Sequence, residues 1–138
     1  MANLKEKCLN YLREEGYCPT IDDDGDIKLK VQGLTMYIRT SDTDDEFLKV
    51  WLPFIWSIEN DNERAKLHWV ANKLNREYKC GKIYLTDDDT HAVCEIFISD
   101  SDVKLGAIVS RCIMILTQMR GELSQLMREY EALAIHHQ

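Results

Sequence analysis

Apolar residues recur at steps of four and three over the last third of the chain, and this is the most regular pattern in the sequence. They are Leu105, Val109, Cys112, Leu116, Met119, Leu123, Leu126, Tyr130 and Leu133, here called the apolar seam. Such a seam is typical of a long helix that buries one face. The pattern predicts a helix over about residues 101–134, with Asp100 or Ser101 as its N-cap. At 1.5 Å per residue the helix would be about 50 Å long, more than the width of a small domain.

The sequence is compatible with two arrangements of this helix. If it runs straight, its second half projects and can pair with a second copy of the chain. The contact residues would then be Leu116, Met119, Leu123, Leu126 and Tyr130. If Gly121 kinks the helix, since glycine costs about 1 kcal/mol inside a helix, the second half folds back onto its own sheet. We expect a homodimer that uses either this helix or an exposed strand edge.

The first half of the chain predicts an antiparallel sheet. Apolar and polar residues alternate over residues 27–31 and again over 34–39, which is the period of a half-buried strand. Gly33 stands between the two runs, as expected for a hairpin. A third strand is expected over 47–56, and Pro53 either ends its regular pairing or lies at an edge.

Two more helices and a second hairpin complete the predicted fold. Helical spacing predicts helices over about residues 3–15 and 61–78, and residues 82–86 and 91–99 are expected to pair as strands. The expected element order is α-β-β-β-β-α-β-β-α. The sequence therefore predicts an α+β fold with a single antiparallel sheet and packed helices, forming one domain over residues 1–138.

The charge balance argues against several classes of function. The chain has 138 residues, with Lys+Arg 17 against Asp+Glu 24 and a net charge of −7. Proteins that bind nucleic acids or anionic membranes need a basic surplus instead. The first residues are charged and no apolar run follows them, so neither a signal peptide nor a membrane span is expected. We expect a cytoplasmic protein with neither nucleic acid nor membrane as a partner.

The sequence lacks motifs for catalysis or for a cofactor. The five cysteines are widely spaced and include no Cys-x-x-Cys pair, so we interpret them as free thiols, with Cys112 in the core. Cys94 and His91 point to opposite faces of their strand by parity and form no catalytic dyad. No glycine-rich phosphate loop is present. We therefore expect no enzymatic activity and no cofactor.

The outward face of the predicted sheet is the first candidate binding site. Residues that alternate with the core positions should share this face, and they combine basic with aromatic side chains. They are Lys28, Lys30, Tyr37, Arg39, Lys49 and Trp51. Such a face suits an acidic peptide or an anion. The alternative is an ordinary solvated sheet face, which alternation alone also predicts.

An acidic rim is the second candidate. The connections at residues 22–26 and 42–46 together carry eight carboxylates and should lie at the same end of the sheet. No metal site is expected, but a weakly held hard cation is a hypothesis. Its weak candidate ligands are Asp22, Asp24, Asp26 and Asp44. The alternative is that aspartate is selected here for turns, and an EF-hand is excluded because Val31 takes the position of the bidentate glutamate.

Several segments resemble YbjN-type proteins in their order and spacing. They are residues 11–17 (YLREEGY), 21–27 (IDDDGDI), 31–35 (VQGLT), 75–79 (NREYK) and 81–85 (GKIYL). The resemblance covers about residues 4–128. The second hairpin departs from it, since it reads Asp-Asp-Asp-Thr where the family often has Asp-Gly.

The resemblance implies a fold and a kind of function. YbjN-type proteins are similar in fold to type III secretion chaperones, with a curved antiparallel sheet and packed helices, often as dimers. They are described as sensory-transduction regulators or chaperone-like proteins, and no catalytic residues are assigned to them. The expected function is thus a non-enzymatic protein-binding module, chaperone-like or regulatory, with an unidentified protein client. The alternative is a small-molecule or cation sensor that uses the sheet concavity or the acidic rim.

Overall fold

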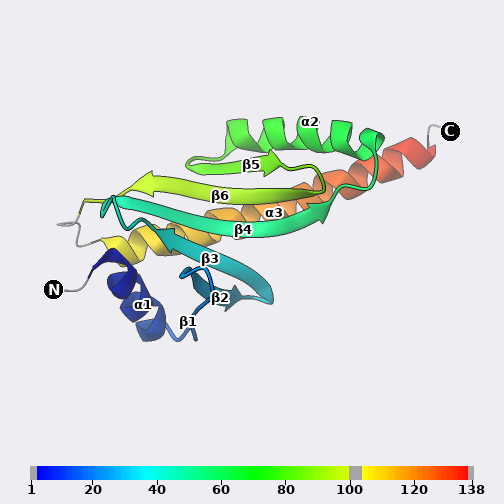
Figure 1. The fold of residues 1–138 in the computed structure, drawn as a ribbon. Coiled ribbons are helices and arrows are strands. Elements are labelled where there is room, and N and C mark those ends of the chain that lie inside the picture. Colours follow the sequence, from blue (N-terminus) through cyan, green and yellow to red (C-terminus); the bar gives the residue numbers. More distant parts are fainter. Residues whose placement is uncertain (1–2, 100–103, 137–138) are drawn as a thin grey trace.

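The computed structural model describes residues 3–99 and 104–136, with side chains as far as Tyr130. These residues form three helices and six strands in the predicted order (Figure 1). The elements are α1 (Leu4–Glu14), β1 (Thr20–Ile21), β2 (Ile27–Val31), β3 (Leu34–Thr40), β4 (Phe47–Ser57), α2 (Asp61–Glu77), β5 (Gly81–Leu85), β6 (Asp89–Phe97) and α3 (Leu105–His136). The predicted N-cap of the last helix, Asp100 or Ser101, lies outside the described residues.

All six strands form one antiparallel sheet, as predicted, and their order within it is β1-β2-β3-β4-β6-β5. The hairpin between β2 and β3 has two turn residues, Gln32 and Gly33, with φ values of 52° and 81°. Positive φ at both positions matches the right-handed twist of the two strands. The edges of the sheet are β1, which has two residues, and β5.

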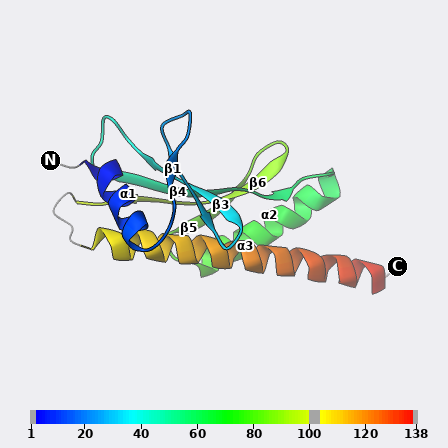
Figure 2. The ribbon, with the colours of Figure 1, turned by 90° about the horizontal axis from the view of Figure 1, so that it is seen from below.

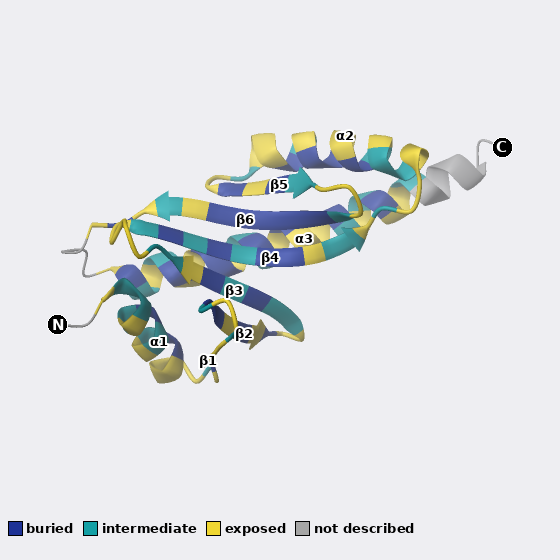
Figure 3. Cartoon of the chain, viewed as in Figure 1, coloured by how far each residue is buried: buried dark blue, intermediate teal, exposed yellow. Residues whose placement is uncertain are grey.

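The helices pack on one face of the sheet (Figure 2). Alternate residues of the strands, such as Leu29 and Val50, form a continuous apolar core with Leu12 of α1, Leu67 of α2 and Val109 of α3. Figure 3 shows the exposed side of α2 turned away from the sheet. In the described part of the chain the opposite face of the sheet carries no helix, and we call it the outward face. Every helix among the described residues is too short or too polar to cross a membrane.

The long helix α3 corrects both expectations about the apolar seam. It continues unbroken from Leu105 to His136, so Gly121 does not interrupt it. From Leu105 to Leu123 the seam is nevertheless buried against its own chain, because α3 runs straight along the sheet and α2 (Figure 2). The side chain of Leu133 lies outside the described residues. The prediction of an intermolecular seam is wrong for its central residues. Leu116, Met119 and Leu123 are fully buried within the chain.

The distal end of the seam also contacts the same chain. Leu126 and Tyr130 are half-buried, and the Tyr130 ring packs edge-on against Trp69 of α2 at a centroid distance of 5.3 Å. An apolar stripe on a helix shows that one side is buried, but α2 and the sheet already supply the covering surface here.

Candidate functional site

The six residues predicted for the outward face lie on it together. The strand register places Lys28 opposite Tyr37, and Tyr37 opposite Trp51. Arg39 likewise stands opposite Lys49. Lys30 follows Lys28 by two residues on β2, so strand alternation puts it on the same side.

An aromatic cluster forms the centre of this face. It contains Tyr37, Trp51, Phe54, Tyr84 and His91, from four strands. The His91 ring lies at its base, 5% exposed, and stacks on Tyr84 at 5.1 Å with an interplanar angle of 16°. Its ring centroid is 5.8 Å from that of Trp51 and 5.1 Å from that of Phe54. Sequence reasoning missed Phe54, Tyr84 and His91, because pairing β4 with β6 requires the register of strands far apart in the chain.

A bulge in β4 places Phe54 over the cluster. The register with β6 shifts between Leu52 and Trp56, and Phe54 has a positive φ of 58°. Pro53 cannot donate a hydrogen bond to the ladder. Regular pairing with β6 stops at Leu52, as one of the two expectations stated, but it resumes at Trp56. The Phe54 N–H donates to Nδ1 of His91 at 3.4 Å, and the Phe54 side chain is 70% exposed. The bulge therefore presents a phenyl ring to solvent.

The polar atoms of the cluster define its electrostatics. The indole N–H of Trp51 is buried and has no hydrogen-bond partner among the described residues. Burial raises the pKa of Tyr84, while the nearby indole of Trp51 acts in the opposite direction. Burial also lowers the pKa of His91, which favours the neutral ring that accepts from Phe54. The indole N–H of Trp51 thus lies near the Tyr84 hydroxyl in an apolar setting.

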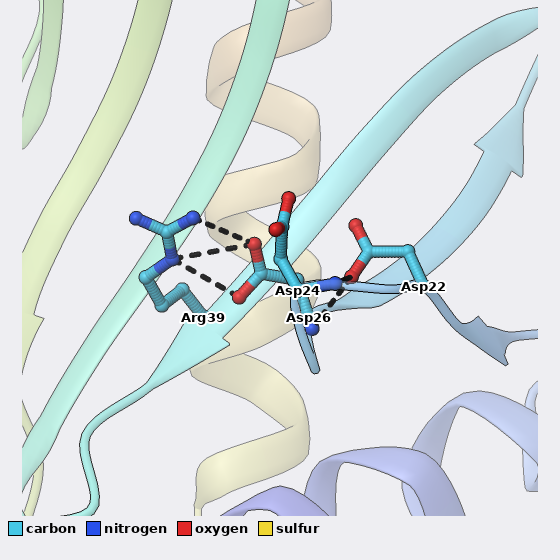
Figure 4. A network of polar contacts seen from close by, with 4 residues as sticks. All are labelled: Asp22, Asp24, Asp26 and Arg39. Carbon is cyan, nitrogen blue, oxygen red and sulfur yellow. Dashed lines mark hydrogen bonds and ion pairs between the residues drawn. The ribbon is translucent and has the colours of Figure 1, made fainter.

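Ion pairing makes the outward face less basic than its composition suggests. The guanidinium of Arg39 binds both carboxylate oxygens of Asp26, with Nη2 to Oδ2 at 2.8 Å and Nε to Oδ1 at 3.0 Å (Figure 4). The Asp26 side chain is 7% exposed, and its hydrogen bonds raise the pKa of Arg39. Lys82 pairs with Glu95 at 3.5 Å. Lys49 lies with its Nζ 4.9 Å from the centroid of the Trp51 ring.

Turn geometry accounts for the acidic rim. Carboxylate oxygens of Asp22, Asp24 and Asp26 lie within 4.8 Å of one another. However, Asp22 Oδ1 accepts the N–H groups of Asp24 and Asp26, at 3.0 and 2.9 Å. Asp44 belongs to the other connection, where its Oδ1 accepts the Glu46 N–H at 3.0 Å. These hydrogen bonds, together with the Arg39 pair, hold the turns and occupy oxygens that a cation would need.

The two edges of the sheet differ in their accessibility. On β5, the side chain of Asn75 hydrogen-bonds both the N–H and the C=O of Ile83. At the other edge, β1 pairs only with the first part of β2, through Thr20 and Ile21. Beyond it lies a groove of about 450 Å³ lined by Tyr17, Cys18, Lys28 and Lys30 among others.

The expected lack of a Cys94–His91 dyad is confirmed. His91 lies in the aromatic cluster of the outward face, whereas Cys94 is fully buried in the core on the other side of the sheet. The outward face thus combines aromatic side chains at its centre with charged side chains around them.

Two solved structures are similar in fold to this chain. A solved structure of an uncharacterized protein from Methanothermobacter thermautotrophicus aligns with a TM-score of 0.64 and 14% identity, over 91% of this chain and 97% of that chain. YbjN from E. coli, described as a putative transcription regulator, aligns with a TM-score of 0.52 and 14% identity, over 92% and 90% of the two chains. At this identity the likeness shows the fold. The comparison with curated proteins found no match.

The family comparison covers nearly all of the chain. The model described as "T3SS (YopN, CesT) and YbjN peptide-binding chaperone 1" matches residues 3–131. The resemblance to YbjN-type proteins is thereby confirmed, and the chain belongs to the TY-Chap1 family of T3SS and YbjN peptide-binding chaperones.

Proposed function

We propose that the chain is a non-enzymatic peptide-binding module, chaperone-like or regulatory, and that an extended client segment binds across the outward face. The single observation that carries this proposal is the aromatic cluster on a sheet face without a covering helix in the described residues. The family's description as peptide-binding chaperones supports the same function.

The chemistry of the cluster suits a peptide. Phe54 offers a largely exposed ring, and Trp51 with Tyr37 offers a second, tilted pair at 5.7 Å. Apolar side chains of a client would pack on these rings, since aromatic groups bury much area at little cost in side-chain entropy. Lys28 and Lys30, both exposed, would favour an acidic residue nearby in the client.

The face is favoured over the β5 edge as the docking surface. Strand addition needs unpaired N–H and C=O groups along an edge. On β5 those of Ile83 are already bonded to Asn75. The alternative function, a cation sensor at the acidic rim, is less supported because Asp22 and Asp26 already bind backbone amides and Arg39.

Peptide binding is tested by fluorescence anisotropy with labelled short peptides that tile an unfolded model client. Phe54→Asn removes the exposed ring at a position whose positive φ suits asparagine. We expect this variant and Tyr37→Ser each to bind the tightest-binding peptide with an affinity at least tenfold lower than the wild type. Trp69→Ser is the matched control, since Trp69 is an exposed aromatic on α2 away from the face. Wild-type affinity in both test variants would contradict the proposal.

We also propose a cytoplasmic homodimer. The five cysteines are free, as expected in a reducing compartment. Because the centre of the apolar seam is buried within the chain, we propose the strand edge of β2 beyond β1 as the dimer contact. Light scattering of the full chain at micromolar concentration tests this, and a monomer there contradicts it.

A further inference from the structure

Three cysteines far apart in the sequence meet at one point of the fold. Cys80 precedes β5, Cys94 lies on β6 and Cys112 lies on α3. Their Sγ atoms are all within 4.8 Å of one another. Gly81 stands opposite Cys94 in the strand register, which brings the start of β5 beside β6. We call this group the thiol cluster, and it lies on the opposite side of the sheet from the aromatic cluster.

The backbone is held in a strained conformation to place Cys80 there. Cys80 has a φ of 69°, and the Gly81 N–H donates to the Lys79 carbonyl at 2.7 Å. A hydrogen bond between residues two apart around a positive φ is a γ-turn of the rare, strained type. Strain of this kind persists only where surrounding contacts enforce it, and it concentrates at functional sites.

Two contacts enforce this turn. Gly81 packs so closely on α3 that a Cβ there would lie 2.4 Å from Met119 Sδ and 2.8 Å from Ile115 Cγ2. On the other side of the turn, the Tyr78 hydroxyl donates to Glu122 Oε1 at 2.6 Å. Both contacts tie the segment that carries Cys80 to the helix that carries Cys112.

The surroundings of the cluster supply an entrance and a compensating charge. A pocket of about 240 Å³ opens beside Cys80 and Cys112, lined by Ile96, Ile108 and Ile115 together with Lys79 and Arg111. Cys94 and Cys112 are buried, whereas Cys80 is exposed. The lining contains only thiols as metal-binding groups.

We propose that Cys80, Cys94 and Cys112 bind one Zn²⁺ ion through three thiolates. Zn–S bonds of about 2.3 Å in tetrahedral geometry require sulfur atoms about 3.8 Å apart. The Sγ atoms of the thiol cluster lie at most 4.8 Å apart. Each separation therefore has to shorten by about 1 Å or less to reach this value. The fourth position faces the pocket and takes a water molecule. Three thiolates and one Zn²⁺ leave a single negative charge, which Arg111 offsets.

Titration of the reduced full chain with Co²⁺, a spectroscopic substitute for Zn²⁺, tests the site. We expect one equivalent of Co²⁺ to give thiolate-to-cobalt charge-transfer absorption, which Zn²⁺ then abolishes by displacement. In Cys80→Ser, where the altered side chain is exposed, two thiolates remain, and we expect the band to lose about a third of its intensity and the affinity to drop at least about tenfold. Cys18→Ser is the matched control, since Cys18 is an exposed cysteine outside the cluster, and it should keep both.

A second measurement separates metal binding from damage to the fold. Zn²⁺ should raise the melting temperature of the wild type and of Cys18→Ser, but not that of Cys80→Ser, whose circular dichroism should match the wild type. The proposal is overturned if the wild type gives no charge-transfer band, if Cys80→Ser keeps both the wild-type band intensity and the wild-type affinity, or if a disulfide within the cluster persists in reductant.

Discussion

The side-chain amide of Asn75 takes the place of a neighbouring strand beside Ile83. Its Oδ1 accepts the Ile83 N–H at 2.7 Å and its Nδ2 donates to the Ile83 carbonyl at 3.0 Å. A backbone strand would make the same two hydrogen bonds to an edge residue. Open sheet edges invite pairing with other chains, so α2 closes β5 at its centre with one residue.

Removal of this amide should open the edge. We expect Asn75→Ala to lower the free energy of unfolding by about 2 kcal/mol, because two partly buried backbone groups lose their partner. Hydrogen exchange at the Ile83 amide should accelerate, and light scattering should detect self-association. Asn72→Ala, one turn earlier on the same helix and exposed, should change neither. Unaltered exchange at Ile83 in Asn75→Ala would contradict this role.

The Arg39–Asp26 pair should depend on the planar guanidinium. Arg39→Lys keeps the charge but cannot bind both oxygens of the nearly buried carboxylate. We expect it to lower the free energy of unfolding by about 1–2 kcal/mol, measured by urea denaturation. Lys30→Gln, an exposed cation on the neighbouring strand, should stay within about 0.5 kcal/mol of the wild type. Equal stability of Arg39→Lys and wild type would show that the bidentate geometry contributes nothing.

His91 should make stability depend on pH in the acidic range. Burial lowers its pKa in the folded state, Lys49 adds to this effect and Asp89 opposes it. The unfolded chain therefore binds more protons once the pH falls below the ordinary histidine value of about 6.5. The stability that neutral His91 contributes is fully present above that pH and is lost as the pH falls through it toward the folded pKa.

Variants isolate this titration. Denaturation between about pH 5 and pH 7 should give a flatter pH dependence for His91→Phe than for the wild type. His68→Gln, which alters an exposed histidine on α2, should keep the wild-type slope. An unchanged slope in His91→Phe would assign the dependence to other groups.

The elements that could be predicted are those with a local signal. Alternation over residues 27–31 and the glycine at the turn define β2 and its hairpin without knowledge of any partner. Parity then places Tyr37, Lys49 and Trp51 on one face, which the register of β3 with β4 bears out geometrically. Helical period likewise predicts α2 and α3.

The contacts that could not be predicted depend on how distant strands pair in register and on where the helices cross the sheet. Cys80, Cys94 and Cys112 show no metal-binding spacing, because their approach arises from the pairing of β5 with β6 and the course of α3 beneath them. The apolar seam shows that α3 buries one side, but the amphipathic stripe is the same whether its own α2 or a second chain covers it. Arg39 and Asp26, thirteen residues apart, likewise meet only through the hairpin.

Two glycines provide a matched test of how α3 packs. At Gly81 a Cβ would meet Met119 and Ile115 at 2.4 and 2.8 Å, whereas at Gly121 nothing lies within 4 Å. We expect Gly81→Ala to destabilise the fold by about 1–3 kcal/mol through overpacking. Gly121→Ala should stabilise it by about 0.5–1 kcal/mol, because alanine is the better helix former at an exposed position.

Thermal or urea denaturation of both variants measures these opposite changes. Destabilisation by Gly121→Ala would mean that a second chain covers this exposed stretch of α3, since within the chain the added methyl group meets no atom. A neutral Gly81→Ala would mean that β5 can move away from α3. In that case the turn at Cys80 would not be held in place, and the thiol cluster would lose the packing that brings Cys80 to Cys112.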